Sequence, residues 1–276
     1  MSDHNSLNIV FWGEDAFSNV ILNSLIEAGH HVKLVVTPYY ENVIYKRLEV
    51  TCNKYGIQHI RPQKINSQGV CDAVKQANPD ICVISHFERL IKEPLLSMPP
   101  MGFINLHPSL LPYYRGMAPQ HWPIINGEKE AGITVHYVDE GTDTGDIIVQ
   151  RRFPLNDEMY VSDLQKIWIE NYKTIMVDAI NNIISGAPTK VQRHLEGSYY
   201  GKLKEDQCHI NPSGSVQDAY NLVRGVSLPY YGARYDNLII YRAHILKEGE
   251  RTTTDSPVIS FHDGKLIVEQ YKETNN

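Results

Sequence analysis

The sequence has no uninterrupted apolar stretch of 18 residues, so it offers no candidate for a membrane-spanning helix. Its first residues, MSDHNSLNIVFWG, place acidic Asp3 and no basic residue before the apolar run, which argues against a secretory signal peptide. Cysteines are few and form no Cys-x-x-Cys pair, so neither disulfide bonds nor a thiolate zinc site is expected. They are Cys52, Cys71, Cys82 and Cys208. These absences favour a protein of the reducing cytoplasm without a membrane partner.

Positive charge is also scarce. The 276 residues include 26 Lys or Arg against 32 Asp or Glu, a net charge of −6. This composition lacks the excess of basic residues that is typical of nucleic-acid-binding proteins. The chain is 42% hydrophobic and 21% charged, as is typical of a globular protein. This length allows one large domain and one small one.

Glycine-rich phosphate-binding loops are missing. The first predicted strand-to-helix turn, FWGEDAFSN, has the single glycine Gly13 where a dinucleotide fingerprint needs three, and we expect Gly13 to form a tight turn. Glu14 and Asp15 occupy the helix start, where carboxylates compete with a phosphate for the same amides. No GxxxxGK motif occurs either, so we expect no nicotinamide or P-loop site.

Short apolar runs alternate with helical patterns through the first half of the chain. Strands that are apolar throughout, separated by helices, predict an α/β fold with a Rossmann-like, mostly parallel sheet covered by helices on both faces. The predicted strands are 7–12, 31–37, 57–60, 80–86 and 102–107, and the predicted helices are 14–29 (closed by Gly29), 45–56, 68–79 and 94–99. Ligands of such sheets bind at the carboxyl ends of the strands.

One of these strand ends carries polar side chains in an apolar setting. The stretch INLHPSLLPYYRG places Asn105 and His107 two residues apart, and Pro108 stops regular structure just after them. Because His107 precedes a proline, its backbone is held extended and the direction of its ring is largely preset. Taken singly, His107 is most simply a core histidine and Asn105 a turn amide. Their position together at a strand end favours a catalytic role for both.

A second polar segment follows an alternating strand at 133–138. The stretch DEGTDTGD packs four carboxylates and two glycines into eight residues, and a further strand begins at 147. A solvated acidic loop is the simplest interpretation, and the spacing does not fit an EF-hand. Asp143 stands out, because Thr142, Thr144 and Gly145 offer local bonds to hold it.

Asn105, His107 and Asp143 together suit acyl transfer. An amide N–H stabilises a developing oxyanion, an imidazole exchanges a proton near neutral pH, and a carboxylate orients or charges that imidazole. No GxSxG nucleophile elbow is present, so a covalent acyl-enzyme is not expected. The pattern predicts direct transfer, in which the substrate supplies the nucleophile.

The motifs INLHPSLLPYYRG and DTGD resemble those of the folate-dependent formyltransferases, which pass a formyl group from 10-formyltetrahydrofolate to an amine. The resemblance extends over about residues 7–190, and a weaker similarity is found near residues 220–235. It implies Asn105, His107 and Asp143 as the catalytic trio and a folate pocket without any metal. HFERLI and the loop before Asp143 would form that pocket, with Phe87, Arg89, Leu90, Ile91, Val138, Asp139 and Glu140 as its lining.

The resemblance also implies a mechanism. A neutral amine attacks the formyl carbon, Asn105 and protonated His107 stabilise the oxyanion, and Asp143 helps to move the amine proton through water. The sequence leaves open which of His107 and Asp143 holds the proton first.

The carboxyl-terminal part predicts a small domain. Residues 181–210 read as a connector; a helix capped by Ser215 and ended by Gly225 then precedes strands at 237–246, 257–262 and 265–271, with a hairpin at HDGK. We therefore expect a catalytic domain at 1–195 and a small helix-and-β domain at 196–276.

The acceptor is inferred by similarity to one branch of the family. RGMAPQHWPIINGE resembles the nucleotide-sugar N-formyltransferases, and LPYYGARY does so with Tyr231 in place of a proline. We expect a dTDP-4-amino-4,6-dideoxyhexose acceptor for O-antigen synthesis, and a homodimer formed through the small domain. Candidates for contacts with the nucleotide are Tyr113, Tyr114, Arg115, Trp122, Tyr230 and Tyr231. Three alternatives remain: a methionyl-tRNA formyltransferase, a formyltetrahydrofolate hydrolase and a non-catalytic folate-binding module.

Overall fold

The computed structural model describes residues 6–41, 46–117, 119–192, 196–249 and 256–274. The chain divides into two compact units, and the second takes two segments from the middle of the sequence. The first unit comprises 1–115, 133–151 and 168–197, and the second comprises 116–132, 152–167 and 198–276. The domain boundary expected at 195/196 stays a prediction, since each unit is built from several separate segments of the chain.

A seven-stranded sheet dominates the first half of the chain, in the order β3-β2-β1-β4-β5-β7-β8. Its elements, as they occur along the chain, are β1 (Asn8–Gly13), α1 (Ala16–Glu27), β2 (His31–Val36), α2 (Lys46–Tyr55), β3 (Gln58–Ile60), α3 (Gln68–Ala77), β4 (Ile81–Ser85), β5 (Phe103–His107), β7 (Glu130–Tyr137), β8 (Ile147–Pro154) and α5 (Val161–Ile184). Strands β1 to β5 run parallel, and β7 pairs with β5 in the opposite direction. This confirms the predicted Rossmann-like, mostly parallel sheet.

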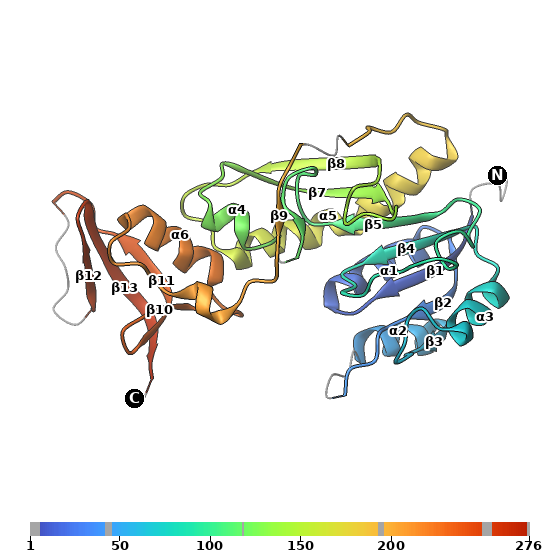
Figure 1. Cartoon of the computed structure of the whole chain (residues 1–276), viewed down its shortest axis with the longest axis horizontal. Helices are drawn as coiled ribbons and strands as arrows, with labels where there is room; N and C mark the ends of the chain where they lie inside the picture. Colours follow the sequence, from blue (N-terminus) through green and yellow to red (C-terminus); the bar gives the residue numbers. More distant parts are fainter. Residues whose placement is uncertain (1–5, 42–45, 118, 193–195, 250–255, 275–276) are drawn as a thin grey trace. The chain divides into compact units, whose positions relative to one another are not determined.

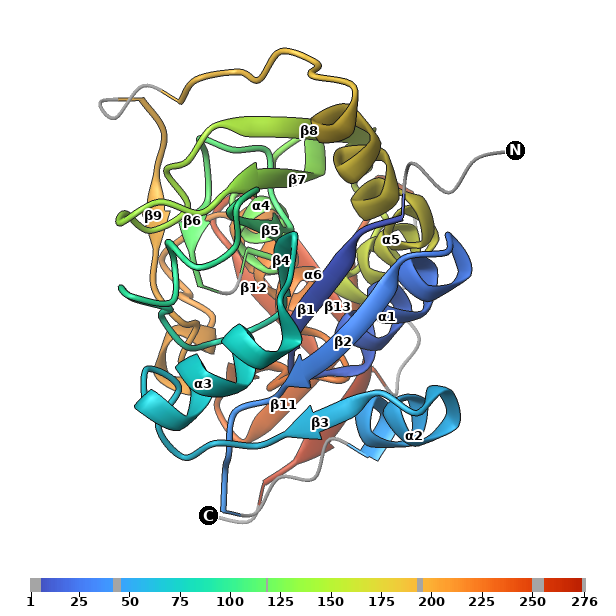
Figure 2. The same ribbon diagram turned by 90° about the vertical axis from the view of Figure 1, so that its right-hand side faces the viewer.

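Helices cover both faces of this sheet. Figure 2 shows α1 and α5 on one side and α3 on the other. The α3 face encloses a core that includes Trp12, Ile84 and Phe103, and β1 is buried on both faces, as its continuous apolar run predicts. Because every second residue of a strand points to the same face, Asn105 and His107 lie on the same face as Phe103, at the carboxyl end of β5.

The second unit holds a four-stranded antiparallel sheet with one helix packed on it (Figure 1, orange to red). Its elements are α4 (Trp122–Ile125), β9 (Tyr199–Tyr200), a 3₁₀ helix (Glu205–Cys208), α6 (Val216–Val226), β10 (Ala233–Tyr235), β11 (Leu238–Ile245), β12 (Val258–Phe261) and β13 (Gly264–Glu273). The two-residue strand β6 (Arg115–Gly116), which pairs with β9, spans the boundary between the two units in the sequence. Ser215 caps α6 by accepting a hydrogen bond from the Asp218 amide at 3.0 Å, as predicted. The predicted hairpin joins β12 to β13, which confirms the small helix-and-β domain.

Several local predictions were wrong. Gly13 is the last residue of β1 rather than part of a tight turn; a Cβ there would lie 2.7 Å from the Ser18 Cβ, so close packing requires the glycine. Helix α6 runs through Gly225 to Val226, and 94–99 forms turns instead of a helix. The 24-residue helix α5, which extends into the supposed connector, was not predicted at all.

Candidate active site

Strands β5 and β7 bring the first polar groups together. Their antiparallel register sets Asn105 directly opposite His136, and His107 opposite Thr134. Paired residues of neighbouring strands point to the same face of a sheet, so these four side chains form one polar strip. The alternation seen in the sequence at 133–138 does not mean one solvent-exposed face, because β7 is buried on both faces for most of its length.

The loop after β7 adds Asp143 to this strip. One carboxylate oxygen lies 3.4 Å from the Asn105 Nδ2, and the other lies 3.5 Å from the His107 Nδ1. The backbone of Asp143 is left-handed, with φ of +55°, a conformation that Asp and Asn tolerate better than most residues. Three residues that the sequence places up to 38 positions apart therefore meet around one carboxylate.

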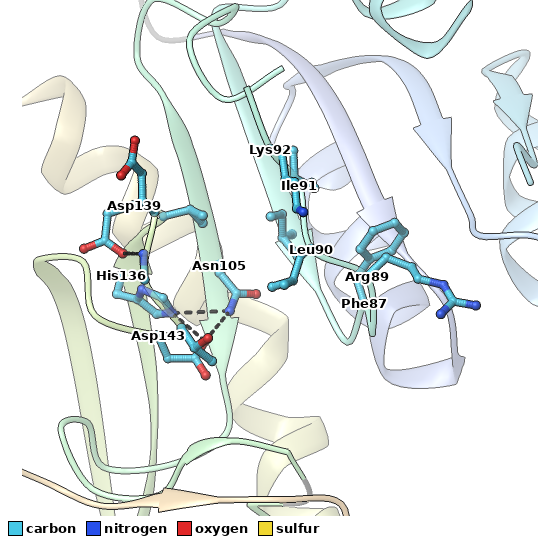
Figure 3. Close-up of a pocket in the computed structure, with 14 residues that line it drawn as sticks. Phe87, Arg89, Leu90, Ile91, Lys92, Asn105, His136, Asp139 and Asp143 are labelled. Atoms are coloured by element: carbon cyan, nitrogen blue, oxygen red, sulfur yellow. Dashed lines mark hydrogen bonds and ion pairs between the residues drawn. The ribbon is translucent and has the colours of Figure 1, made fainter. Parts of the chain in front are cut away.

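His136 is a fourth member that sequence reasoning missed. Its Nε2 lies 3.2 Å from the Asn105 Nδ2 and 3.5 Å from the Asp143 carboxylate, and the side chain is almost wholly buried. Figure 3 shows His136, Asn105 and Asp143 turned toward one another. Only the register between β5 and β7 identifies His136 as a site residue, and a single sequence does not give that register.

The hydrogen bonds assign the proton of His136. Because Asn105 donates to the His136 Nε2, the neutral ring carries its hydrogen on Nδ1, which lies 2.7 Å from the Tyr137 carbonyl oxygen. The Asn105 amide thus directs both of its hydrogens inward, to His136 and to Asp143. It can stabilise an external oxyanion only with a hydrogen that it redirects from one of these partners.

Burial and two neighbouring groups set the proton affinity of His107. Burial lowers its pKa below the usual value of 6.5, and this effect outweighs the Asp143 carboxylate and the Tyr114 carbonyl, which both raise the pKa. The ring donates from Nε2 to the Tyr114 oxygen at 2.7 Å, so Nδ1, the nitrogen that faces Asp143, is free to accept a proton. The expectation that protonated His107 stabilises the oxyanion stays a prediction.

A cavity of about 170 Å³ opens beside Asn105, His136 and Asp143. Its remaining lining includes every residue expected to hold folate: Phe87, Arg89, Leu90, Ile91, Val138, Asp139 and Glu140. His107 is not among the lining residues, but it lies 3.5 Å from the carboxylate of Asp143, which is. Apolar side chains together with the polar loop 138–143 suit a flat heteroaromatic ring that is edged with hydrogen-bonding groups.

Polar and cation–π contacts lie on the two sides of this cavity. Asp139 accepts hydrogen bonds from the Gly141 amide at 3.0 Å and from the Thr144 hydroxyl at 2.6 Å, so the Thr144 side chain orders the loop through Asp139. On the opposite side, the guanidinium of Arg89 lies over the ring of Tyr40 at 4.7 Å, directed away from Asn105 (Figure 3). Within the described residues, no group of three His, Cys, Asp or Glu side chains is arranged to hold a metal ion.

The residues expected to contact the nucleotide differ in accessibility. Tyr113 is 55% exposed and Tyr231 is 42% exposed, so both rings have free faces. Tyr114 is buried. Arg115, the expected phosphate ligand, is wholly buried, and its guanidinium donates to Gln192 at 2.9 Å and to the Glu196 carbonyl at 3.2 Å. This burial argues against a direct phosphate contact.

Trp122 and Tyr230 belong to the second unit, where both rings pack against neighbours. Trp122 lies 4.8 Å from the ring of Tyr200, and Tyr230 lies edge-on to His121 at 4.3 Å, with its hydroxyl bound by Gln165. These contacts give both side chains a packing role.

The fold and the site define an α/β group-transfer enzyme with an amide, two imidazoles and a carboxylate beside a small cavity. The family described as Formyl transferase matches residues 7–180, and the chain belongs to this family. The protein is thus a folate-dependent formyltransferase. Within the described residues, no helix is long and apolar enough to cross a membrane.

Relatives found by sequence and relatives found by structure carry different descriptions. Methionyl-tRNA formyltransferases from Clostridium botulinum and Clostridioides difficile are 29% and 30% identical to the chain; the matches cover 96% and 98% of it, and 96% and 93% of the relatives. The solved structure of WlaRD, a sugar 3N-formyl transferase with dTDP and 5-N-formyl-THF, aligns over 99% of both chains with a TM-score of 0.75 and 22% identity. An N-formyltransferase from Helicobacter canadensis, in complex with folinic acid and dTDP-3-aminofucose, covers 96% of this chain and 100% of its own, with a TM-score of 0.74 and 21% identity. At these identities the structural matches show the fold alone.

Proposed function

We propose that the protein transfers the formyl group of 10-formyltetrahydrofolate to the amine of a nucleotide-linked amino sugar, a dTDP-4-amino-4,6-dideoxyhexose, in O-antigen synthesis. The observation that carries the formyl transfer is the convergence on Asp143, with Asn105 at 3.4 Å and His107 at 3.5 Å from its carboxylate, beside the cavity. A cytoplasmic homodimer is part of the same proposal.

Two features support a sugar acceptor. Residues 201–276 contain nine Lys or Arg and ten Asp or Glu, a balance of −1, so this part of the chain has no net positive charge for a tRNA backbone. The two solved relatives described with dTDP or a dTDP-sugar match this fold over nearly its whole length. The exposed rings of Tyr113 and Tyr231 are the side chains that we assign to stacking on the nucleotide base.

Methionyl-tRNA is the second candidate acceptor. The methionyl-tRNA formyltransferases match this chain over nearly their whole length at about 30% identity, and that similarity includes the carboxyl-terminal domain. We rank this candidate second because of the charge balance, since tRNA binding depends on neutralising phosphates with basic side chains.

The mechanism follows from the contacts of the trio. As the amine attacks the formyl carbon, charge grows on the formyl oxygen, and the Asn105 amide redirects one hydrogen to it. The amine becomes acidic as its bond to carbon forms, and the proton passes to the His107–Asp143 pair, where Nδ1 of the neutral imidazole is free to take it. The same pair then returns the proton to the departing folate nitrogen, which completes direct transfer without a formyl-enzyme.

The lowered pKa of His107 sets the pH dependence of this reaction. A rate that needs neutral His107 is full above the pKa of the folded protein and falls as the pH drops through it, so we expect the acid limb of kcat/KM for the folate donor to have its midpoint below pH 6.5. The rate of the wild type between pH 5 and 8 measures this midpoint. A midpoint above 6.5 would show that burial does not control the proton of His107.

The acceptor is tested by incubating the full-length protein with 10-formyltetrahydrofolate and one acceptor at a time. We expect N-formyl product with a dTDP-4-amino-4,6-dideoxyhexose, and much slower reaction with methionyl-tRNA. Faster formylation of methionyl-tRNA would establish the second candidate, and equal loss of formyl groups without any amine would establish hydrolysis. Folate binding without turnover on any acceptor would identify a binding module.

A further inference from the structure

The chain that follows α5 runs alongside the Asp143 loop. Lys190 and Ile147 exchange two backbone hydrogen bonds, at 2.9 and 2.8 Å, which form an antiparallel bridge. This bridge fixes the course of the chain and brings Gln192 against the loop two residues further on. From its sequence, this segment was expected to be only a connector.

Gln192 binds the backbone of the loop on both sides of Thr144. Its Nε2 donates to the carbonyl oxygen of Asp143 at 3.1 Å and to that of Gly145 at 2.6 Å, and the side chain is 5% exposed. These two bonds use both hydrogens of the amide. They clamp the peptide units that carry Asp143 in its left-handed conformation.

The other end of the same amide reaches Arg115. The Gln192 Oε1 accepts from the Arg115 Nη2 at 2.9 Å, and Arg115 is wholly buried. The peptide just before Arg115 carries the Tyr114 carbonyl oxygen, which accepts the hydrogen bond from His107 at 2.7 Å. One buried amide therefore links the backbone that holds the His107 ring to the backbone that holds Asp143.

We propose that Gln192 is a positioning residue for formyl transfer, which sets the approach of Asp143 to His107 through the backbone and does not touch the substrate. Gln192 is not among the residues that line the cavity, which is consistent with an indirect role. The inference rests on the proposed catalytic role of the trio but not on the identity of the acceptor. A displacement of about 1 Å at a catalytic group costs on the order of 100-fold in rate.

Gln192→Glu removes the hydrogen-bond donor of the Gln192 amide and keeps its acceptor. The introduced carboxylate has nearly the same shape and keeps an acceptor for the buried Arg115, now as an ion pair. Its second oxygen replaces the donor, and so faces two carbonyl oxygens where an N–H was bonded. We therefore expect the loop at Asp143 to shift while the contact with Arg115 is kept.

The experiment compares kcat, the affinity for folinic acid and the melting temperature of the full-length wild type and Gln192→Glu, and repeats the comparison in the Asp143→Asn background. We expect kcat to fall about 10- to 100-fold in the wild-type background. In the Asp143→Asn background the further loss should shrink to about twofold, because both changes act through the same carboxylate. A purely structural role of Gln192 would give the same loss in both backgrounds and would overturn the proposal, as would an unchanged kcat.

A second readout needs no acceptor. Amide hydrogen exchange at residues 143–146 should become faster in Gln192→Glu and in the uncharged variant Gln192→Met, while exchange in α3 stays unchanged. The matched control is Thr189→Val, which removes an exposed hydrogen bond from the same segment to Asp146 at 3.2 Å and should leave both exchange and kcat as in the wild type. Unchanged exchange at 143–146 in both Gln192 variants would contradict the proposal even if no acceptor were formylated.

Discussion

Asp143→Asn is expected to lower kcat for formyl transfer about 10²- to 10⁴-fold, the range that a positioned acid or base contributes. The substitution keeps the size of the side chain, and Asn adopts the left-handed backbone of this position as readily as Asp does. What it removes is the charge that faces Nδ1 of His107 at 3.5 Å and the proton-accepting capacity of the pair. Steady-state rates at saturating donor and acceptor measure the loss.

Asp146→Asn serves as the control for this prediction. Asp146 belongs to the same acidic loop and accepts a hydrogen bond from Thr189, but it does not line the cavity. Both variants change the net charge of the loop equally, which makes them a matched pair. The control should keep the wild-type rate, because Asp146 does not take part in the reaction. A loss shared by both variants would mean that the charge of the loop, rather than Asp143, supports transfer.

Asn105→Ala is expected to reduce the rate about 10²- to 10³-fold, the usual cost of losing one oxyanion donor. The KM for folate should change little, because the lost hydrogen bond strengthens mainly in the transition state. Since Asn105 also donates to the buried His136 at 3.2 Å, we expect a loss of about 1–3 kcal/mol in the free energy of unfolding.

Thermal unfolding separates the two effects of Asn105→Ala. His136→Gln is the comparison, because it changes the partner of Asn105 and leaves the amide itself in place. If Asn105→Ala retained most of the wild-type rate, another group would have to polarise the formyl carbon. If it failed to fold, Asn105→Ser, with a shorter polar side chain, would carry the same measurement.

The first half of the fold could be predicted because its strands are apolar on both faces and are separated by helices. The trio could be found because the motif places Asn105 and His107 at the end of a strand. The long helix α5 was missed, although its buried Trp168 and Tyr172 follow the spacing of a helix face.

The rest depends on contacts between distant segments, to which a single sequence gives no access. His136 enters the site through its register with Asn105, and Gln192 does so across 49 residues from Asp143. Arg115 was expected to meet a phosphate because guanidinium groups suit phosphates. The fold instead buries it against Gln192, an arrangement that the local sequence does not reveal.

The account depends on direct transfer at Asp143 of a formyl group that is never bound to the protein. Single-turnover reactions with 10-[¹³C]formyltetrahydrofolate and the dTDP-amino sugar test this directly. We predict that the label appears in the N-formyl product at the rate at which it leaves folate, that no labelled protein forms at any time, and that Asp143→Asn slows both processes together. Label found on the protein before it reaches the sugar, or released as formate while the sugar stays unmodified, would contradict the account.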